Sequence, residues 1–150
     1  MNSKDTKSKS NSSIFSTEKA IVMGILNLNN DSFYDGGKYI YEKQIIERCK
    51  LMLDEGASII DIGAQSSRPG ATQFSSKEEI KKLLPIITLL KNIFDNITIS
   101  IDTFWGNTAK ECIQAGADII NDISAGNIDK NMFSTIAKQD VPYIMMHMQG

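Results

Sequence analysis

Five short apolar stretches alternate with longer segments of helical periodicity from residue 20 to the end of the chain. Most are continuously apolar rather than alternating, which is typical of strands in a parallel sheet covered on both faces. The expected strands span residues 20–26, 58–63, 97–101, 117–121 and 142–147. This order predicts an α/β fold with a parallel sheet and right-handed crossovers. Two architectures satisfy it, a doubly wound sheet and part of a (β/α)8 barrel of the TIM type.

Two of the expected helices end at a glycine that precedes the next strand. The first, around residues 45–53, is followed by Gly56, and the third, residues 107–115, by Gly116. The stretches "GASIIDIG" and "GADIINDIS" that begin at these glycines share the pattern Gly-Ala-x-Ile-Ile. Glycine is the usual residue at a helix C-terminus, so the similarity predicts a repeated helix–glycine–strand junction.

The other two helices are expected from signals at their N-termini. Ser76 and Glu79 have capping-box spacing at the start of the second helix. Asp129 is a suitable N-cap for the fourth helix, which is expected to end near residue 139.

Composition restricts the class of protein. A net charge of −2 gives no electrostatic basis for binding nucleic acid or an anionic membrane. No apolar run approaches the roughly 20 residues that span a bilayer, and no secretory signal is present. Cys49 and Cys112 belong to no metal-binding or C-x-x-C pattern. We expect reduced thiols in a cytoplasmic protein, with a disordered Ser/Lys-rich tail over residues 1–17 and one domain over 18–150.

Every expected strand has a polar or ionisable residue at or near its carboxyl end. The residues are Asn27, Asp61, Asp102, Asn121 with Asp122, and His147. In a barrel these ends meet at one rim, where the loops that follow the strands build the active site. The pattern therefore favours a shared site over unrelated turn residues.

The residue types suggest chemistry, although structural roles stay open for several. Asn27 offers a neutral oxygen that suits Mg²⁺, which keeps most of its water ligands. Asp102 and Asn121 suit the edge of a flat nitrogen heterocycle. Asp61 lies inside its strand and is equally well explained as a buried structural carboxylate. His147, the only histidine, has structural and functional interpretations of equal weight.

The stretch "SSRPGA" (residues 66–71) resembles an anion-binding loop. Arg68 supplies a bidentate guanidinium and the serines supply hydroxyls. The chain contains neither G-x-G-x-x-G nor a Walker P-loop, which argues against nucleotide binding.

Together these segments resemble dihydropteroate synthase, of the pterin-binding (β/α)8 barrel family. The segments that carry the resemblance are "MGILNLNNDSFYDGG", "GASIIDIGAQSSRPGA", "ISIDT", "AGADIINDISAG" and "YIMMHMQG". The resemblance implies a transferase of folate biosynthesis. It would join 6-hydroxymethyl-7,8-dihydropterin diphosphate to p-aminobenzoate and release pyrophosphate. It also implies sulfonamide sensitivity and a homodimeric full-length enzyme.

The resemblance assigns roles to individual residues. Asn27 would help hold Mg²⁺ and pyrophosphate, and Phe33 and Asp35 would belong to a mobile first loop that shields the site. Ser67 and Arg68 would contact p-aminobenzoate and pyrophosphate. The positions matching the pterin-reading pair are Asp102 and Asn121, and those matching the pocket wall are Ile123, Ile144 and Met146.

Two departures from the family pattern stand out. Asn29-Asn30 replaces Thr-Pro and removes a restraint on φ. Gln65 stands where many members have Glu, which puts an ionic role there in doubt.

Two alternative interpretations are a pterin-dependent methyltransferase and a truncated barrel without activity. Five expected strands of a barrel's eight predict that the 150-residue chain alone is inactive.

Overall fold

The computed structural model describes residues 20–28, 37–65 and 73–147, where all five expected strands and all four expected helices are present. The strands are β1 (Met23–Asn27), β2 (Ile59–Gly63), β3 (Ile99–Asp102), β4 (Ile119–Asp122) and β5 (Tyr143–Met145). The helices are α1 (Gly37–Asp54), α2 (Ser76–Ile93), α3 (Gly106–Gln114) and α4 (Met132–Gln139). The predicted tail of residues 1–17 lies outside the described residues.

The strands pair in parallel in the order β1-β2-β3-β4-β5. A doubly wound sheet reverses its strand order part-way, whereas a (β/α)8 barrel adds each strand beside the one before it. The described strands therefore form an arc of a barrel-type sheet.

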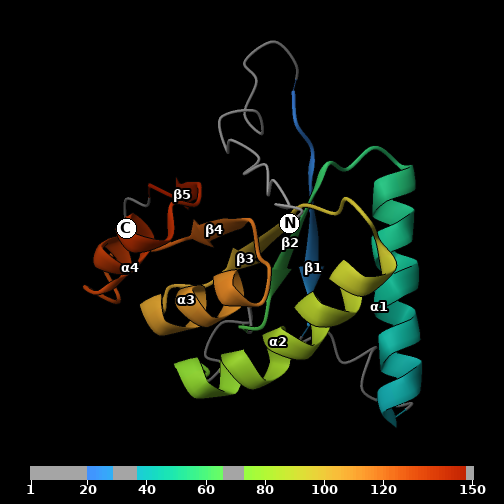
Figure 1. Ribbon diagram of the computed structural model, residues 1–150, viewed down its shortest axis with the longest axis horizontal. Coiled ribbons are helices and arrows are strands. Elements are labelled where there is room, and N and C mark those ends of the chain that lie inside the picture. Colours follow the sequence, from blue (N-terminus) through green and yellow to red (C-terminus); the bar gives the residue numbers. More distant parts are fainter. Residues whose placement is uncertain (1–19, 29–36, 66–72, 148–150) are drawn as a thin grey trace, which may run out of the picture.

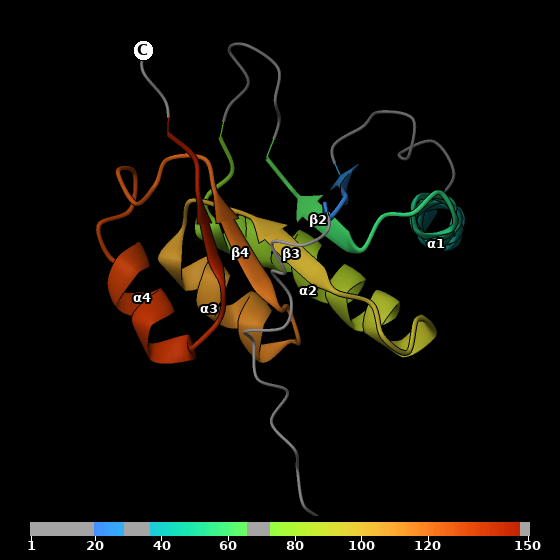
Figure 2. The same ribbon diagram turned by 90° about the horizontal axis from the view of Figure 1, so that it is seen from above.

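The four helices lie on one side of this curved sheet (Figures 1 and 2). Among the described residues, helices cover only this face of the sheet. Residues of the helix-free face are buried as well, which agrees with the continuous apolar runs of the strands. Ile59, Asp61, Ser100 and Ile119 of that face are all at most 4% exposed. Ile25, on the edge strand β1, is 71% exposed.

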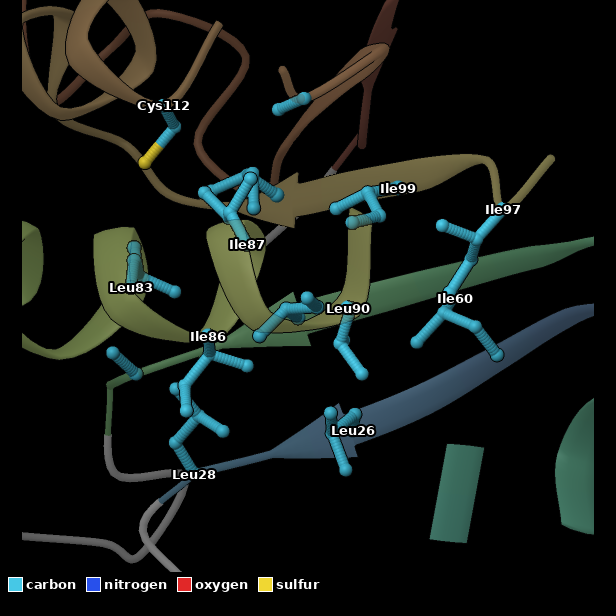
Figure 3. Packing of buried hydrophobic residues seen from close by; sticks show 14 of the residues in the cluster. Leu26, Leu28, Ile60, Leu83, Ile86, Ile87, Leu90, Ile97, Ile99 and Cys112 are labelled. Carbon is cyan, nitrogen blue, oxygen red and sulfur yellow. The ribbon is translucent and has the colours of Figure 1, made fainter. Parts of the chain in front are cut away.

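The hydrophobic core fills the space between the sheet and the helices (Figure 3). Leu26, Ile62 and Ile101, which are neighbours in register across the sheet, project toward α2. Helix α2 meets them with Leu83, Ile87 and Leu90, all fully buried. At roughly 1.5–3 kcal/mol for each buried aliphatic side chain, this layer fixes how the sheet sits against the helices.

The repeated junction predicted from the sequence is present in backbone detail. Gly56 (φ 104°) and Gly116 (φ 110°) both adopt the left-handed conformation after a helix. Each glycine N–H donates to a carbonyl three residues back, and the next N–H donates to one five residues back. This is the Schellman pattern, and it starts β2 and β4 in the same way.

Two N-cap predictions are wrong. Helix α2 is capped by Ser75, whose N–H (2.8 Å) and hydroxyl (2.6 Å) both donate to Glu78 Oε2. The capping box therefore starts one residue earlier than predicted, and the side chain of Glu79 is buried instead. Asp129 does not cap α4, whose N-cap is Asn131. Asp129 Oδ2 accepts from the backbone N–H of Gly106 at 2.8 Å and Asp129 Oδ1 accepts from that of Asn131 at 2.9 Å, so the carboxylate joins the first turn of α3 to the N-cap of α4.

Cys49 and Cys112 are buried free thiols on α1 and α3. Burial raises the pKa of each to about 12, so both stay protonated at neutral pH. Within the described ranges, every helix is too short or too polar to cross a lipid bilayer.

Candidate functional site

The predicted site residues lie in one row across the carboxyl ends of the strands. Asn27 is paired in register with Gly63, Gly63 with Asp102, Asp102 with Asn121, and Asn121 with Ile144. Alternate residues of a strand point to opposite faces, so this row belongs to the helix-free face with Asp61 and Ser100 below it. The structure thus places four predicted residues from four strands side by side, with a glycine between the first two.

Asp61 and Asn121 are joined on this face by a hydrogen bond. Asn121 Nδ2 donates to Asp61 Oδ2 at 3.1 Å. Burial raises the pKa of Asp61, and neighbouring Ser100 and Asn121 offset part of that rise. Among the described residues, Asp61 Oδ1 and Ser100 Oγ are buried without a partner at hydrogen-bonding distance. The hydrogen bond helps to orient the Asn121 amide, which gives Asp61 a structural role on this face.

Asp102 lies in a concentration of negative charge. Burial raises its pKa, the charges of Asp61, Glu79 and Asp122 raise it further, and the result is a pKa of about 6. The ionised form still predominates at pH 7. The negative charges that raise the pKa of Asp102 would also stabilise a cation bound beside it. The site is thus electrostatically suited to a donor-rich or cationic ligand.

Asp122 is fully buried and has a structural role. Its Oδ1 accepts from the N–H (2.7 Å) and hydroxyl (2.8 Å) of Ser124, and its Oδ2 from Gly126 N–H (2.8 Å) and Tyr143 Oη (2.7 Å). These bonds shape the loop after β4. From the sequence, Asn121 and Asp122 are equally plausible site residues at the end of β4. In the structure their side chains lie on opposite faces of the sheet.

The predicted pocket-wall residues continue the row on its β4 and β5 side. Ile144 is the register partner of Asn121, and Met146 follows two residues later. Ile123, two residues after Asn121, and Met146 are 37% and 42% exposed. Exposed aliphatic side chains beside polar strand ends could cover one face of a flat ligand. His147 is exposed beyond the end of β5.

Asn27 closes the row at its other end. The parts of the chain that the structure describes hold no group of three His, Cys, Asp or Glu residues arranged to bind a metal ion. A single amide oxygen fits Mg²⁺ only where water and ligand phosphates complete the coordination, which is the usual arrangement for this ion.

Phe33, Asp35, Ser67 and Arg68 lie outside the described residues, as does the Asn29-Asn30 departure. The structure adds two residues that sequence reasoning did not assign to the site, Glu79 and Thr103. Thr103 follows β3 directly, and Glu79 accepts its hydroxyl at 2.7 Å. The sequence signal for Glu79 is that of a helix cap, and Thr103 carries no signal of its own.

The sequence profile described as "Pterin binding enzyme" matches residues 23–150. The chain belongs to the pterin binding enzyme family. That match includes the whole row from Asn27 to Ile144 and all five strands.

Curated relatives in this family are named for folate synthesis. The chain is 45% identical over 130 residues to a dihydropteroate synthase of Streptococcus pyogenes, covering 87% of this chain and 48% of the relative. It is 47% identical over 136 residues to a mitochondrial folate synthesis bifunctional protein of Pisum sativum, covering 89% of this chain and 26% of the relative. The chain therefore spans about half the length of the synthase and about a quarter of the bifunctional protein.

Solved structures with the same fold are dihydropteroate synthases. A Xanthomonas albilineans enzyme with 4-aminobenzoic acid superposes with a TM-score of 0.79 at 34% identity, covering 89% of this chain and 48% of that one. An Anaplasma phagocytophilum enzyme with bound 6-hydroxymethylpterin-monophosphate gives 0.76 at 32% identity, covering 87% and 49%. The fold is that of a (β/α)8 barrel, of which this chain forms the first five strands and four helices.

Proposed function

We propose that a barrel containing this chain is a dihydropteroate synthase, joining 6-hydroxymethyl-7,8-dihydropterin diphosphate to 4-aminobenzoate with release of pyrophosphate. The observation that carries the proposal is the acceptor-rich row formed by Asp102 and Asn121. Asn121 Nδ2 donates to Asp61 Oδ2, and we expect the carbonyl oxygen of the same amide to accept from a ligand. The 2-amino group and adjacent ring N–H of a pterin offer donors that match this edge.

The electrostatics of the site agree with the chemistry of this reaction. Departure of pyrophosphate leaves positive charge on the pterin, and the negative field around Asp102 stabilises it. Mg²⁺, when bound, would neutralise the departing pyrophosphate, and Asn27 is the residue that we expect to contribute an oxygen ligand. Ser67 and Arg68 would contact the anion and 4-aminobenzoate, and Phe33 and Asp35 would help exclude water.

The test is the pair of affinities for 6-hydroxymethylpterin and 4-aminobenzoate in the full-length protein and its Asp102→Asn variant. An amide presents a donor where the pterin also has a donor, so pterin binding should weaken by about 1–3 kcal/mol. Binding of 4-aminobenzoate should change little. The control Asp95→Asn makes the same chemical change at an exposed position.

Equal losses for both ligands would contradict the pterin-edge role of Asp102. A protein that binds pterin but forms no dihydropteroate from both substrates and Mg²⁺ would instead favour a pterin-dependent methyltransferase. Sulfonamide competition with 4-aminobenzoate and a homodimer in solution belong to the same proposal. Inhibition assays and sedimentation would test them.

A further inference from the structure

The carboxylate of Asp122 holds the start of the loop that follows β4. It is fully buried on the face of the sheet opposite to Asn121. Asp122 Oδ1 accepts from both the N–H (2.7 Å) and the hydroxyl (2.8 Å) of Ser124, and Oδ2 accepts from the N–H of Gly126 (2.8 Å). The backbone that follows Ile123 is therefore tied to the strand residue that precedes it.

The loop has a backbone conformation that needs such support. Ala125 (φ 48°) and Gly126 (φ 77°) both adopt the left-handed region. This region is strained for alanine, because its Cβ comes close to a carbonyl oxygen. The Ala125 N–H donates to the Asp122 carbonyl at 3.2 Å, and a methyl group added at Gly126 would overlap the ring of Phe133. The loop is thus held closely from both sides, with Ile123 at its start.

A second strand joins this arrangement through Tyr143 of β5. Its hydroxyl donates to Asp122 Oδ2 at 2.7 Å, and its ring meets that of Phe133 edge to face, with the centroids 5.9 Å apart. Burial and the hydrogen bond to the negatively charged Asp122 raise the pKa of Tyr143, so the hydroxyl remains a donor at neutral pH. The Met146 N–H donates to the Asp122 carbonyl at 3.1 Å. Asp122 therefore links the carboxyl ends of β4 and β5, close to Ile123 and Met146.

We propose that Asp122 and Tyr143 are positioning residues that hold Ile123 beside Asn121 at the rim of the candidate site. The inference rests on the proposed function, in which Ile123 belongs to the wall of the pterin pocket. Tyr143 is the register partner of Ile120 and packs against the core, so it acts on a ligand only through the loop. An aliphatic side chain stabilises a flat ring only where the two surfaces meet closely, so a small displacement of Ile123 lowers the affinity.

The experiment is a double-mutant cycle between Tyr143→Phe and Ile123→Ala in the full-length protein. Calorimetry measures the affinities for 6-hydroxymethylpterin and for 4-aminobenzoate. Tyr143→Phe removes only the hydroxyl and keeps the ring that packs on Phe133. It should weaken pterin binding by about fivefold and 4-aminobenzoate binding by less than about twofold. In the Ile123→Ala background the same change should weaken pterin binding by less than about twofold.

Asp122→Asn perturbs the same arrangement from the other partner. The amide places an N–H group against donors that the carboxylate accepted, so pterin affinity should fall by about tenfold, again with coupling to Ile123. If this variant unfolds, the cycle with Tyr143→Phe decides alone. Ser134→Ala is the control, because it removes an exposed hydroxyl of α4 that donates to the Asn131 carbonyl at 2.9 Å. It should alter neither affinity.

A measurement without ligand separates the positioning role from the proposed function. The Ile123 methyl signals in NMR spectra should shift in Tyr143→Phe, and hydrogen exchange at the Gly126 amide should become faster. Unchanged Ile123 signals, an equal loss for both ligands, or a loss of pterin affinity that persists in the Ile123→Ala background would overturn the positioning role. A parent protein that binds neither ligand, with Ile123 signals that still respond to Tyr143→Phe, would overturn the proposed function and with it the link of this arrangement to pterin binding.

Discussion

Gly63 leaves room for the carboxylate of Asp102 on the neighbouring strand. A methyl group added at Gly63 would lie 3.3 Å from Asp102 Oδ2 and 3.6 Å from its Cβ. The two residues are register partners, so this side chain lies over the glycine in the row between Asn27 and Asn121. A small residue at this position of β2 is thus a condition for the geometry of the candidate site.

Gly63→Ala should therefore displace Asp102 by a few tenths of an ångström and weaken pterin binding. We expect a loss of about 1 kcal/mol in binding, with little change in the free energy of unfolding. Calorimetry with 6-hydroxymethylpterin measures the first quantity and urea unfolding measures the second. In an Asp102→Ala background the added methyl group should have no further effect on binding. A loss that persists there would show that Gly63 acts on something else.

Asp102→Asn should stabilise the fold at neutral pH while it weakens binding. The pKa of Asp102 rises from the usual 3.8 to about 6, so folding favours the protonated form. The stability from this proton is complete below pH 3.8 and is lost as the pH rises through 6. Asparagine is uncharged at every pH and avoids that loss. The free energy of unfolding of the variant should therefore exceed that of the parent by about 1–2 kcal/mol at pH 7.5, allowing for partial exposure. Urea unfolding should show the gain shrinking at pH 4, and an equal gain at both pH values would contradict this account.

Asp61→Asn should lower the pKa of Asp102. The charge of Asp61 is among the causes of the raised value, whereas an asparagine there can still accept from Asn121 Nδ2 through its own carbonyl. The Asp102 carboxyl signal, followed by NMR against pH, should titrate below 6. The acid limit of pterin binding should move in the same direction. Asp95→Asn is the control, and an unchanged Asp102 titration in Asp61→Asn would show that the charge of Asp61 does not contribute to the raised pKa.

Asp129→Ala should destabilise the protein by about 1 kcal/mol, the usual effect of losing a helix cap. The Asp129 carboxylate accepts from the N–H of Gly106 and from the N–H of Asn131, so the loss should appear at the first turn of α3 as well as at the start of α4. Hydrogen exchange resolved by segment would show which helix frays. Faster exchange confined to α4 would contradict a role of Asp129 at α3, and Asp95→Ala provides the matched exposed substitution.

The elements of this fold could be predicted from local signals. Apolar runs marked all five strands, because a buried parallel strand needs apolar residues on both faces. Gly56 and Gly116 marked two helix ends, because an αL residue after a helix is most easily a glycine. The polar residues at the strand ends then identified one rim, since parallel strands bring their carboxyl ends together.

The partners of individual side chains could not be predicted in this way. Glu78 and Glu79 are both plausible capping residues from spacing alone. Only their directions in the folded helix pair Glu78 with Ser75 and Glu79 with Gln65 and Thr103. Asp129 likewise precedes α4 in sequence, and only the folded structure shows that its carboxylate also accepts from the N–H of Gly106 in α3.

The sequence by itself determined the alternation of strands and helices, the glycine junctions and the residue types available at the strand ends. These depend on periodicity and backbone preference, which act over a few neighbouring residues. Tertiary structure alone decided that Asn121 is oriented by Asp61, that Gly63 makes room for Asp102, and that Glu79 joins Gln65 to Thr103. Those relations depend on the register of adjacent strands and on burial of charge, which exist only once residues distant in the chain are packed together.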